Sequence, residues 1–186
     1  LYDARKKIAP QFYNGDVIEY IRESRRIANP SDRICYMTDC TELEREEITR
    51  LIVDAGEVPA SVENVYPALW NYWRGFAFSG GEFSEILARY FQDYKRQKLL
   101  GRIEPSFMEA VRDFAEDRPQ FTVPTRESVL EGIAADGVAL CWIDALGCEF
   151  LGFIQSSAER LGLKLKVTPV RVKLPSITSV NRSFYD

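Results

Sequence analysis

The spacing of apolar residues predicts amphipathic helices over much of the chain. Residues 15–28 carry apolar residues on one helical face and charges on the opposite face, with Val17, Ile18 and Ile21 among the apolar positions. Such a stripe is typical of a surface helix whose apolar side packs on a core. We expect this helix to end before Pro30, because proline cannot continue the hydrogen-bonding pattern.

End signals mark further helices. Thr41 and Glu44 have the spacing of a capping box, and the apolar stripe that follows continues to Gly56, a residue suited to a helix C-terminus. Gly101 gives the same signal for a helix over residues 83–100. We also predict helices over 105–118, 126–135 and 148–162.

Three segments have the alternation and the β-branched content of strands. They are residues 33–39, 138–144 and 163–174. The last two flank the helix predicted over 148–162. A strand, a helix and a strand of these lengths predict a right-handed βαβ unit.

We therefore predict an α/β fold built in two parts. Residues 1–120 form a mainly helical region with one short strand, and residues 121–186 form the start of a mixed or parallel sheet. Residues 118–125, with two prolines, are the best candidate for the boundary.

Aromatic and basic residues admit both a structural and a functional interpretation. Residues 66–78 are rich in aromatic side chains, which can stack on nucleobases but more often form core. Residues 95–98 are basic at the end of a helix, where cations complement the helix dipole; phosphate binding is the alternative. For both segments we favour the structural interpretation. A second basic cluster is Arg22, Arg25 and Arg26.

Composition narrows the classes of function. Apolar residues make up 46% of the chain and charged residues 28%, which is typical of a globular protein, and the net charge of -4 gives no general attraction to nucleic acid or lipid. The chain has no histidine, which excludes His-based hydrolase triads and zinc sites. Its sequence contains no apolar run long enough for a membrane span and no signal peptide, so we expect a cytoplasmic protein without a membrane partner.

Asp144 ends an apolar segment and precedes a Leu-Gly turn. In an α/β sheet, ligands bind at the carboxyl ends of strands, which makes this carboxylate a candidate metal ligand. The alternative is that Asp144 caps the helix that begins near Cys148. The residues alone leave both interpretations open.

A cluster of hydroxyl groups follows the last extended segment. Ser176, Thr178 and Ser179 lie within four positions of one another. Next to a divalent cation such a hydroxyl can become a nucleophile without a histidine base, because the metal lowers its pKa. Taken without Asp144, plain helix capping is the simpler explanation.

The sequences IDALGCEFLGFI and KLPSITSVN, taken together, resemble the opening of a PglZ domain. This domain is a branch of the alkaline phosphatase superfamily found in the BREX systems of bacterial phage defence. The resemblance covers residues 136–186. It implies an alkaline-phosphatase-like sheet, Asp144 as a metal ligand, Thr178 as a metal-contacting nucleophile, and Asn181 and Ser176 as supporting residues. If the register of the motif is misread, Ser176 is the alternative nucleophile.

The resemblance implies a metal-dependent phosphohydrolase or phosphodiesterase acting in phage defence. It implies a divalent metal, Zn²⁺ or Mn²⁺, a nucleic acid as a possible substrate, and other subunits of a defence complex as partners. One carboxylate and one hydroxyl are too few ligands for two metal ions. We therefore expect this chain to be part of a larger enzyme and to be inactive by itself. The residues leave open whether it holds a metal alone.

Two hypotheses of other classes compete with catalysis. In the first, residues 1–125 form a helical platform, and the chain is a non-catalytic interaction module of a multi-subunit defence complex. In the second, the basic clusters bind nucleic acid without catalysis, which the acidic net charge opposes.

Overall fold

The computed structural model describes residues 2–79, 83–131, 133, 137–139, 141, 143, 146–173 and 180. Within these ranges the chain is mostly helical, and the helices follow one another through short turns. In chain order they are α1 (Tyr2–Ile8), η1 (Ala9–Gln11), α2 (Asn14–Ser24), α3 (Pro30–Ile34), α4 (Glu42–Ala55), α5 (Val62–Val65), α6 (Pro67–Trp73), α7 (Ser84–Leu100), α8 (Pro105–Asp117), η2 (Pro119–Thr122), α9 (Arg126–Leu130), η3 (Cys148–Phe150) and α10 (Leu151–Arg160).

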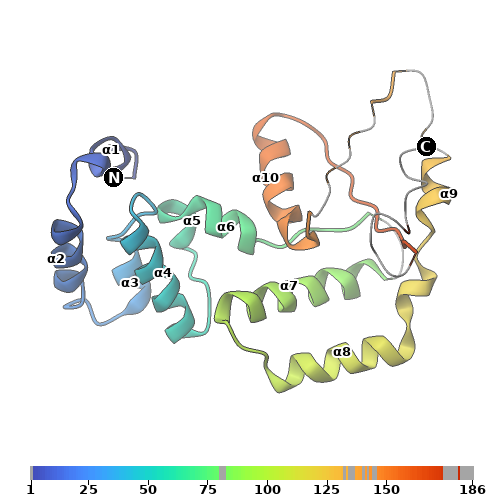
Figure 1. Ribbon diagram of the computed structural model, residues 1–186, viewed down its shortest axis with the longest axis horizontal. Coiled ribbons are helices and arrows are strands. Elements are labelled where there is room, and N and C mark those ends of the chain that lie inside the picture. The colour runs from blue at the N-terminus through green and yellow to red at the C-terminus, as the bar shows by residue number, and fades with distance from the viewer. Residues whose placement is uncertain are drawn as a thin grey trace.

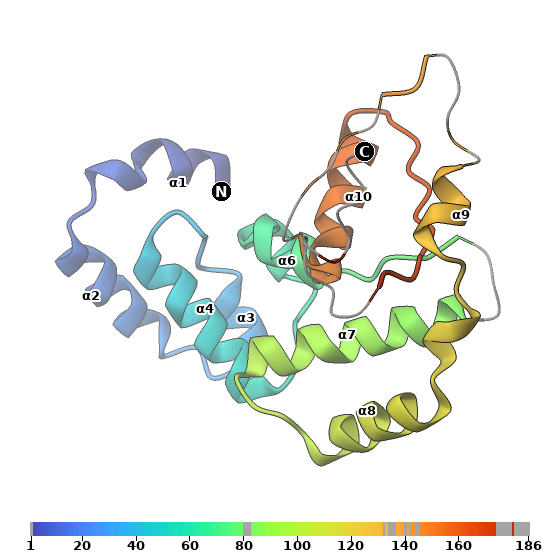
Figure 2. The same ribbon diagram turned by 45° about the vertical axis from the view of Figure 1, so that its right-hand side comes forward.

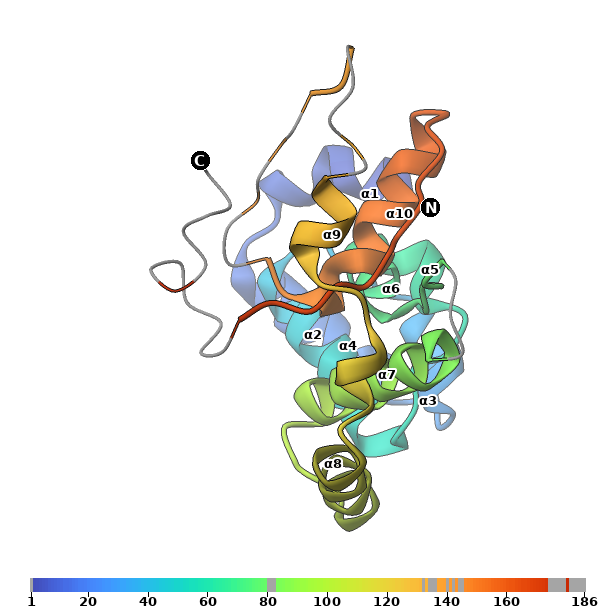
Figure 3. The ribbon, with the colours of Figure 1, turned by 90° about the vertical axis from the view of Figure 1, so that its right-hand side faces the viewer.

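The helices fall into two groups along the long axis (Figure 1). Helices α1 to α4 occupy the N-terminal end, and α5 and α6 lead from them to the centre of the molecule. Helices α7 and α8 lie side by side in both views (Figure 2). Helix α10 packs on α6, and the extended residues 163–173 then cross the start of α9 (Figure 3).

The main core lies among the N-terminal helices. Helices α3, α4 and α5 meet through apolar side chains that are nearly or fully buried, and partly buried side chains of α6 and α7 cover them. The buried members are Ile34, Met37, Ile48, Leu51, Ile52, Val62 and Val65. Because burial of an aliphatic side chain is worth about 1.5–3 kcal/mol, this cluster is the main source of stability at this end.

The end signals predicted for α4 and α7 are confirmed. The Thr41 hydroxyl accepts a hydrogen bond from the Glu44 backbone N–H at 3.3 Å, and Gly56 ends α4 with φ +73°. Gly101 ends α7 in the same left-handed conformation, φ +63°. These positive φ values suit glycine, which has no Cβ to clash with the carbonyl groups.

The predicted strand over residues 33–39 is wrong. Asn29 caps a short helix there, because its side chain accepts hydrogen bonds from the backbone N–H groups of Ser31 and Asp32. Pro30 then occupies the first helical turn, where its missing N–H costs nothing. Ile34 and Met37, three positions apart, are both fully buried, so burial here follows a helical spacing and not an alternation of two.

The predicted α/β fold is also wrong for the part of the chain that the structure describes. It contains no sheet there, and its β pairing is a single isolated parallel bridge between Thr125 and Arg171. Residues 163–173 are extended, but an extended segment forms a strand only beside a neighbour that supplies a ladder of hydrogen bonds. Residues 140, 142 and 144 of the predicted strand 138–144 lie outside the described residues.

The aromatic stripe over residues 66–73 packs against the main core, which agrees with the structural interpretation that we favoured. Tyr66, Leu69 and Trp70 are partly buried against the main core, on the face that the helical spacing predicted. A second aromatic cluster joins α7 to α8, where the Tyr90 ring lies 5.0 Å from Phe114 and 5.7 Å from Phe107, centroid to centroid. Among the described helices, none has both the length and the apolar character needed to cross a bilayer.

Candidate functional site

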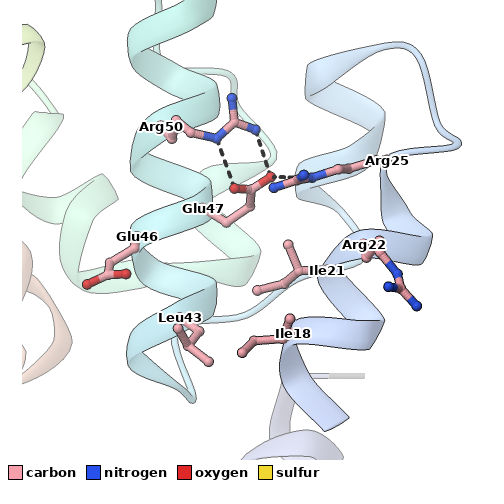
Figure 4. Close-up of a pocket in the computed structure, with 8 residues that line it drawn as sticks. All are labelled: Ile18, Ile21, Arg22, Arg25, Leu43, Glu46, Glu47 and Arg50. Carbon is pink, nitrogen blue, oxygen red and sulfur yellow. Dashed lines mark hydrogen bonds and ion pairs between the residues drawn. The ribbon is translucent and has the colours of Figure 1, made fainter. Parts of the chain in front are cut away.

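A groove lies between α2 and α4 in the N-terminal group (Figure 4). Helix α2 buries Val17 and Ile21 against its neighbours, so its next exposed positions line the edge of the contact with α4. The groove has a volume of about 340 Å³. Its lining residues are Ile18, Ile21, Arg22, Arg25, Leu43, Glu46, Glu47 and Arg50.

One end of this groove is apolar and the other is charged. Ile18, Ile21 and Leu43 face one another across the apolar end in Figure 4. At the charged end, Arg25 reaches across from α2 towards Glu47 of α4. Ile18 is 55% exposed although it belongs to this apolar surface. The arrangement suits a ligand with an apolar part and an ionic part.

Glu47 is the centre of the charged end. Its buried carboxylate pairs with Arg33 and accepts hydrogen bonds from Arg50 at 2.7 and 2.9 Å, while the Arg25 guanidinium lies 4.0 Å away. Arg50 also pairs with Asp54 at 2.5 Å. Three guanidinium groups therefore share two carboxylates, which leaves one positive charge in surplus.

The pKa of Arg33 reflects the crowding of positive charges around Glu47. Burial lowers the pKa of Arg33, and the positive charges of Arg50 and Arg25 lower it further. Like charges held close together disfavour the charged form of each. An additional carboxylate near Arg25 and Arg50 would relieve the repulsion.

A second buried carboxylate fixes α1 on α4. Glu44 is fully buried, and its carboxylate pairs with Arg5 at 2.6 Å and accepts a hydrogen bond from the Thr38 backbone N–H at 3.1 Å. Arg5 also lies over the Tyr20 ring, 4.7 Å from its centroid. These partners satisfy the carboxylate internally, which makes Glu44 a structural residue.

The residues predicted to carry catalysis lie outside the described residues. They are Asp144, Ser176, Thr178 and Asn181. Within the part of the chain that the structure describes, no group of three or more His, Cys, Asp or Glu side chains could hold a metal ion. The donors that the resemblance assigns, a carboxylate and a hydroxyl, are oxygen ligands of the kind that hard divalent cations accept.

The helix that follows the Asp144 motif is held firmly on α6. Gly152 in α10 has no side chain, and a Cβ at this position would lie 2.6 Å from the Arg74 carbonyl oxygen and 2.9 Å from that of Asn71. The Ser156 hydroxyl donates a hydrogen bond to the Asn71 side chain at 2.8 Å, and Arg74 pairs with Glu159 at 3.2 Å. A glycine at residue 152 therefore lets the two helices approach closely.

The first turn of this helical segment is tied to α7 as well. Glu149, buried just after the motif, pairs with Lys98 at 2.9 Å. Burial tends to raise the pKa of Glu149, but the hydrogen bond from Lys98, together with backbone hydrogen bonding, outweighs it and lowers the pKa. The Tyr72 and Phe150 rings meet edge to face at 5.6 Å. The described residues that follow Asp144 therefore pack against α6 and α7 of the helical region.

Lys95 is the most deeply buried cation among the described residues. Its ammonium group donates hydrogen bonds to the backbone carbonyls of Tyr72, Trp73 and Arg74, at 3.1, 3.0 and 2.8 Å. These carbonyls end α6, so the ammonium group satisfies acceptors that the helix leaves open. Desolvation lowers the pKa of Lys95 to about 8.

The basic segment 95–98 therefore has structural partners, as we favoured. Lys95 caps α6, Arg96 pairs with Glu104 at 3.4 Å, and Lys98 pairs with Glu149. Arg22 and Arg26 of the other basic cluster pair with Glu19 and Glu23 of α2. Sequence reasoning missed the groove, since no local pattern links α2 to Glu47; the closest signal was the basic cluster that includes Arg25.

Comparison with known proteins identifies no relative of this chain. No protein-family model, no curated protein and no solved structure matches it.

Proposed function

We propose that the chain is part of a metal-dependent phosphohydrolase or phosphodiesterase of the PglZ type, acting in phage defence. The observation that carries the proposal is the pair of motifs Asp144-x-Leu146-Gly147 and Pro175-Ser176-x-Thr178-x-x-Asn181. Two features of the described residues support it. A helical segment starts at Cys148, directly after the first motif, and an extended segment over 163–173 leads to the second.

In this proposal Thr178 is the nucleophile and Asp144 binds a divalent metal, Zn²⁺ or Mn²⁺. The metal, when bound, lowers the pKa of the hydroxyl and offsets charge on the phosphoryl oxygens. The Thr178 oxygen attacks phosphorus, the bond to the leaving oxygen breaks, and the proton from Thr178 passes to solvent. Water then hydrolyses the phosphothreonine and releases the phosphoryl product.

The anchored α10 gives the helical region a role in this chemistry. Close packing at Gly152 and the pair between Glu149 and Lys98 fix the residues that follow Asp144. The helical region would then act as the support for the first motif.

The test is the hydrolysis of aryl phosphate mono- and diesters by the whole gene product with added Mn²⁺ or Zn²⁺. We expect Asp144→Ala and Thr178→Ala each to lower the turnover rate by at least about a thousandfold, while Ser179→Ala, the matched control, retains most activity. Unchanged rates in the first two variants would refute the assignment. Loss of turnover in Ser176→Ala alone would move the nucleophile to Ser176.

A non-catalytic interaction module is the second candidate, and the groove between α2 and α4 favours it. The surface combines an exposed apolar side chain, Ile18, with an unbalanced charge, a combination that is common at protein interfaces. If the chain is such a module, a partner subunit should co-purify with it in stoichiometric amount. The partner should stay bound when Asp144 and Thr178 are both changed to alanine; a chain that purifies alone would contradict this role.

A further inference from the structure

We propose that the groove between α2 and α4 binds an acidic amphipathic helical segment of a partner protein. This inference rests on the second candidate function and names the chemistry of the partner. An apolar side chain of the segment would pack on Ile18, Ile21 and Leu43, and a carboxylate about one turn away would reach Arg25 and Arg50.

The charges around Glu47 select an acidic partner. Glu47 and Asp54 are the carboxylates that pair with Arg25, Arg33 and Arg50, so one guanidinium lacks a full partner. Arg25 is the least engaged, at 4.0 Å from Glu47, and its side chain is 60% exposed. A guanidinium readily forms paired hydrogen bonds with a second carboxylate.

The other charged residues of the groove do not cancel this surplus. Glu46 lines the groove, but in Figure 4 its carboxylate points away from α2 and from the arginine side chains. Arg22 points away from α4 in the same view and pairs with Glu19. The surplus positive charge therefore lies at Arg25, beside Arg50, on the side of the groove where Glu47 lies.

The apolar end favours a protein segment over a nucleic acid. Ile18 is 55% exposed and lies beside Ile21 and Leu43, and a phosphate backbone would leave the exposed part of Ile18 without an apolar partner. A helix with a leucine and a glutamate on one face presents both groups at about the spacing of one turn. Recognition of this kind, a helix in a groove, depends on such anchors.

The test uses two labelled probe peptides that form amphipathic helices. Both carry leucines on one face; the acidic probe has glutamates one turn away, and the basic probe has lysines in their place. Fluorescence anisotropy measures their binding to the whole chain. We expect the acidic probe to bind and the basic probe to bind at least about tenfold more weakly.

Substitutions then locate the binding site. Arg25→Glu and Ile18→Ser should each raise the dissociation constant of the acidic probe about tenfold. Arg26→Glu and Ile8→Ser are the matched controls, because Arg26 pairs with Glu23 outside the groove and Ile8 is an exposed residue of α1. Neither control should change the dissociation constant more than about twofold.

Several outcomes would overturn this proposal. The acidic probe does not bind at concentrations up to about 1 mM, or both probes bind equally well. Alternatively, the groove variants and the control variants change the dissociation constant equally. Displacement of the acidic probe by a single-stranded oligonucleotide, with the same dependence on Arg25, would assign the groove to nucleic acid. A partner that co-purifies with the chain and is retained by Arg25→Glu would uphold the module and refute the groove.

Discussion

The N-terminal helices and the C-terminal part of the chain use their apolar residues in opposite ways. Around α3 to α5, Ile34, Ile48 and Ile52 are fully buried. Beyond α9, many large apolar side chains are exposed, including Ile143, Leu161 and Leu163 at 61–70%. The first group stabilises the structure by itself, whereas the second gains stability only when another surface covers it.

The largest expected effect comes from the main core. Ile52→Ala should lower the free energy of unfolding by about 2–5 kcal/mol, because it removes buried apolar surface and leaves a cavity. Leu163→Ala is the matched change in the exposed group and should alter this free energy by less than about 0.5 kcal/mol. Urea denaturation followed by circular dichroism measures both. Equal losses in the two variants would contradict the contrast between the regions.

Lys95 makes the stability of the helical region depend on pH. Its pKa is about 8 in the folded chain against an ordinary 10.5, so the unfolded chain binds more protons between these values. The free energy of unfolding should therefore rise with pH over this window, by up to roughly 3 kcal/mol from this group. The cost of burying the charge is fully present below about pH 8 and disappears above 10.5.

Lys95→Met tests this effect when the pH dependence of the free energy of unfolding is compared between the variant and the unmodified chain. The variant leaves the carbonyls of Tyr72, Trp73 and Arg74 without their donor, which should cost about 1–3 kcal/mol at neutral pH. It should also lose the Lys95 part of the rise in stability between pH 8 and 10.5. If the variant and the unmodified chain have the same pH dependence, the burial of a charged Lys95 is refuted.

The close packing of α10 on α6 should give a somewhat smaller effect. Gly152→Ala would place a Cβ 2.6 Å from a backbone carbonyl oxygen that cannot rotate away, so the helices must separate. We expect a loss of about 1–3 kcal/mol in the free energy of unfolding. Gly15→Ala is the control, because a Cβ there meets nothing within 4 Å and alanine favours the helix. A neutral Gly152→Ala would show that α10 is not held in this position.

The sequence predicted the helices much better than the contacts between them. Thr41, Gly56 and Gly101 mark helix ends through hydrogen bonds and backbone angles that are local, so their pattern is readable without a fold. The strand predicted over residues 33–39 failed because Asn29 and Pro30 start a helix that the apolar residues also fit. Residues 163–173 have a strand-like pattern, but a strand also needs a neighbour, and a pattern does not supply one.

The two candidate sites also differ in how far the sequence alone reveals them. The motif that includes Asp144 and Thr178 is visible in the sequence because its residues are close to one another or at a recognisable spacing. The charged end of the groove joins Arg25, at the end of α2, to Glu47 and Arg50 of α4. Only the fold brings these side chains together. The depressed pKa of Lys95 likewise results from burial, which its place in a basic stretch does not indicate.

The central claim, that Thr178 is the nucleophile of a phosphohydrolase, is tested most directly by trapping the covalent intermediate. The whole gene product is incubated with an aryl phosphate and Mn²⁺, quenched in acid, digested and analysed by mass spectrometry. We expect the peptide that contains Thr178 to gain the mass of one phosphoryl group, and Thr178→Ala to abolish the gain. A phosphoryl group on Ser176 or Ser179, or turnover without any labelled peptide, would contradict the claim.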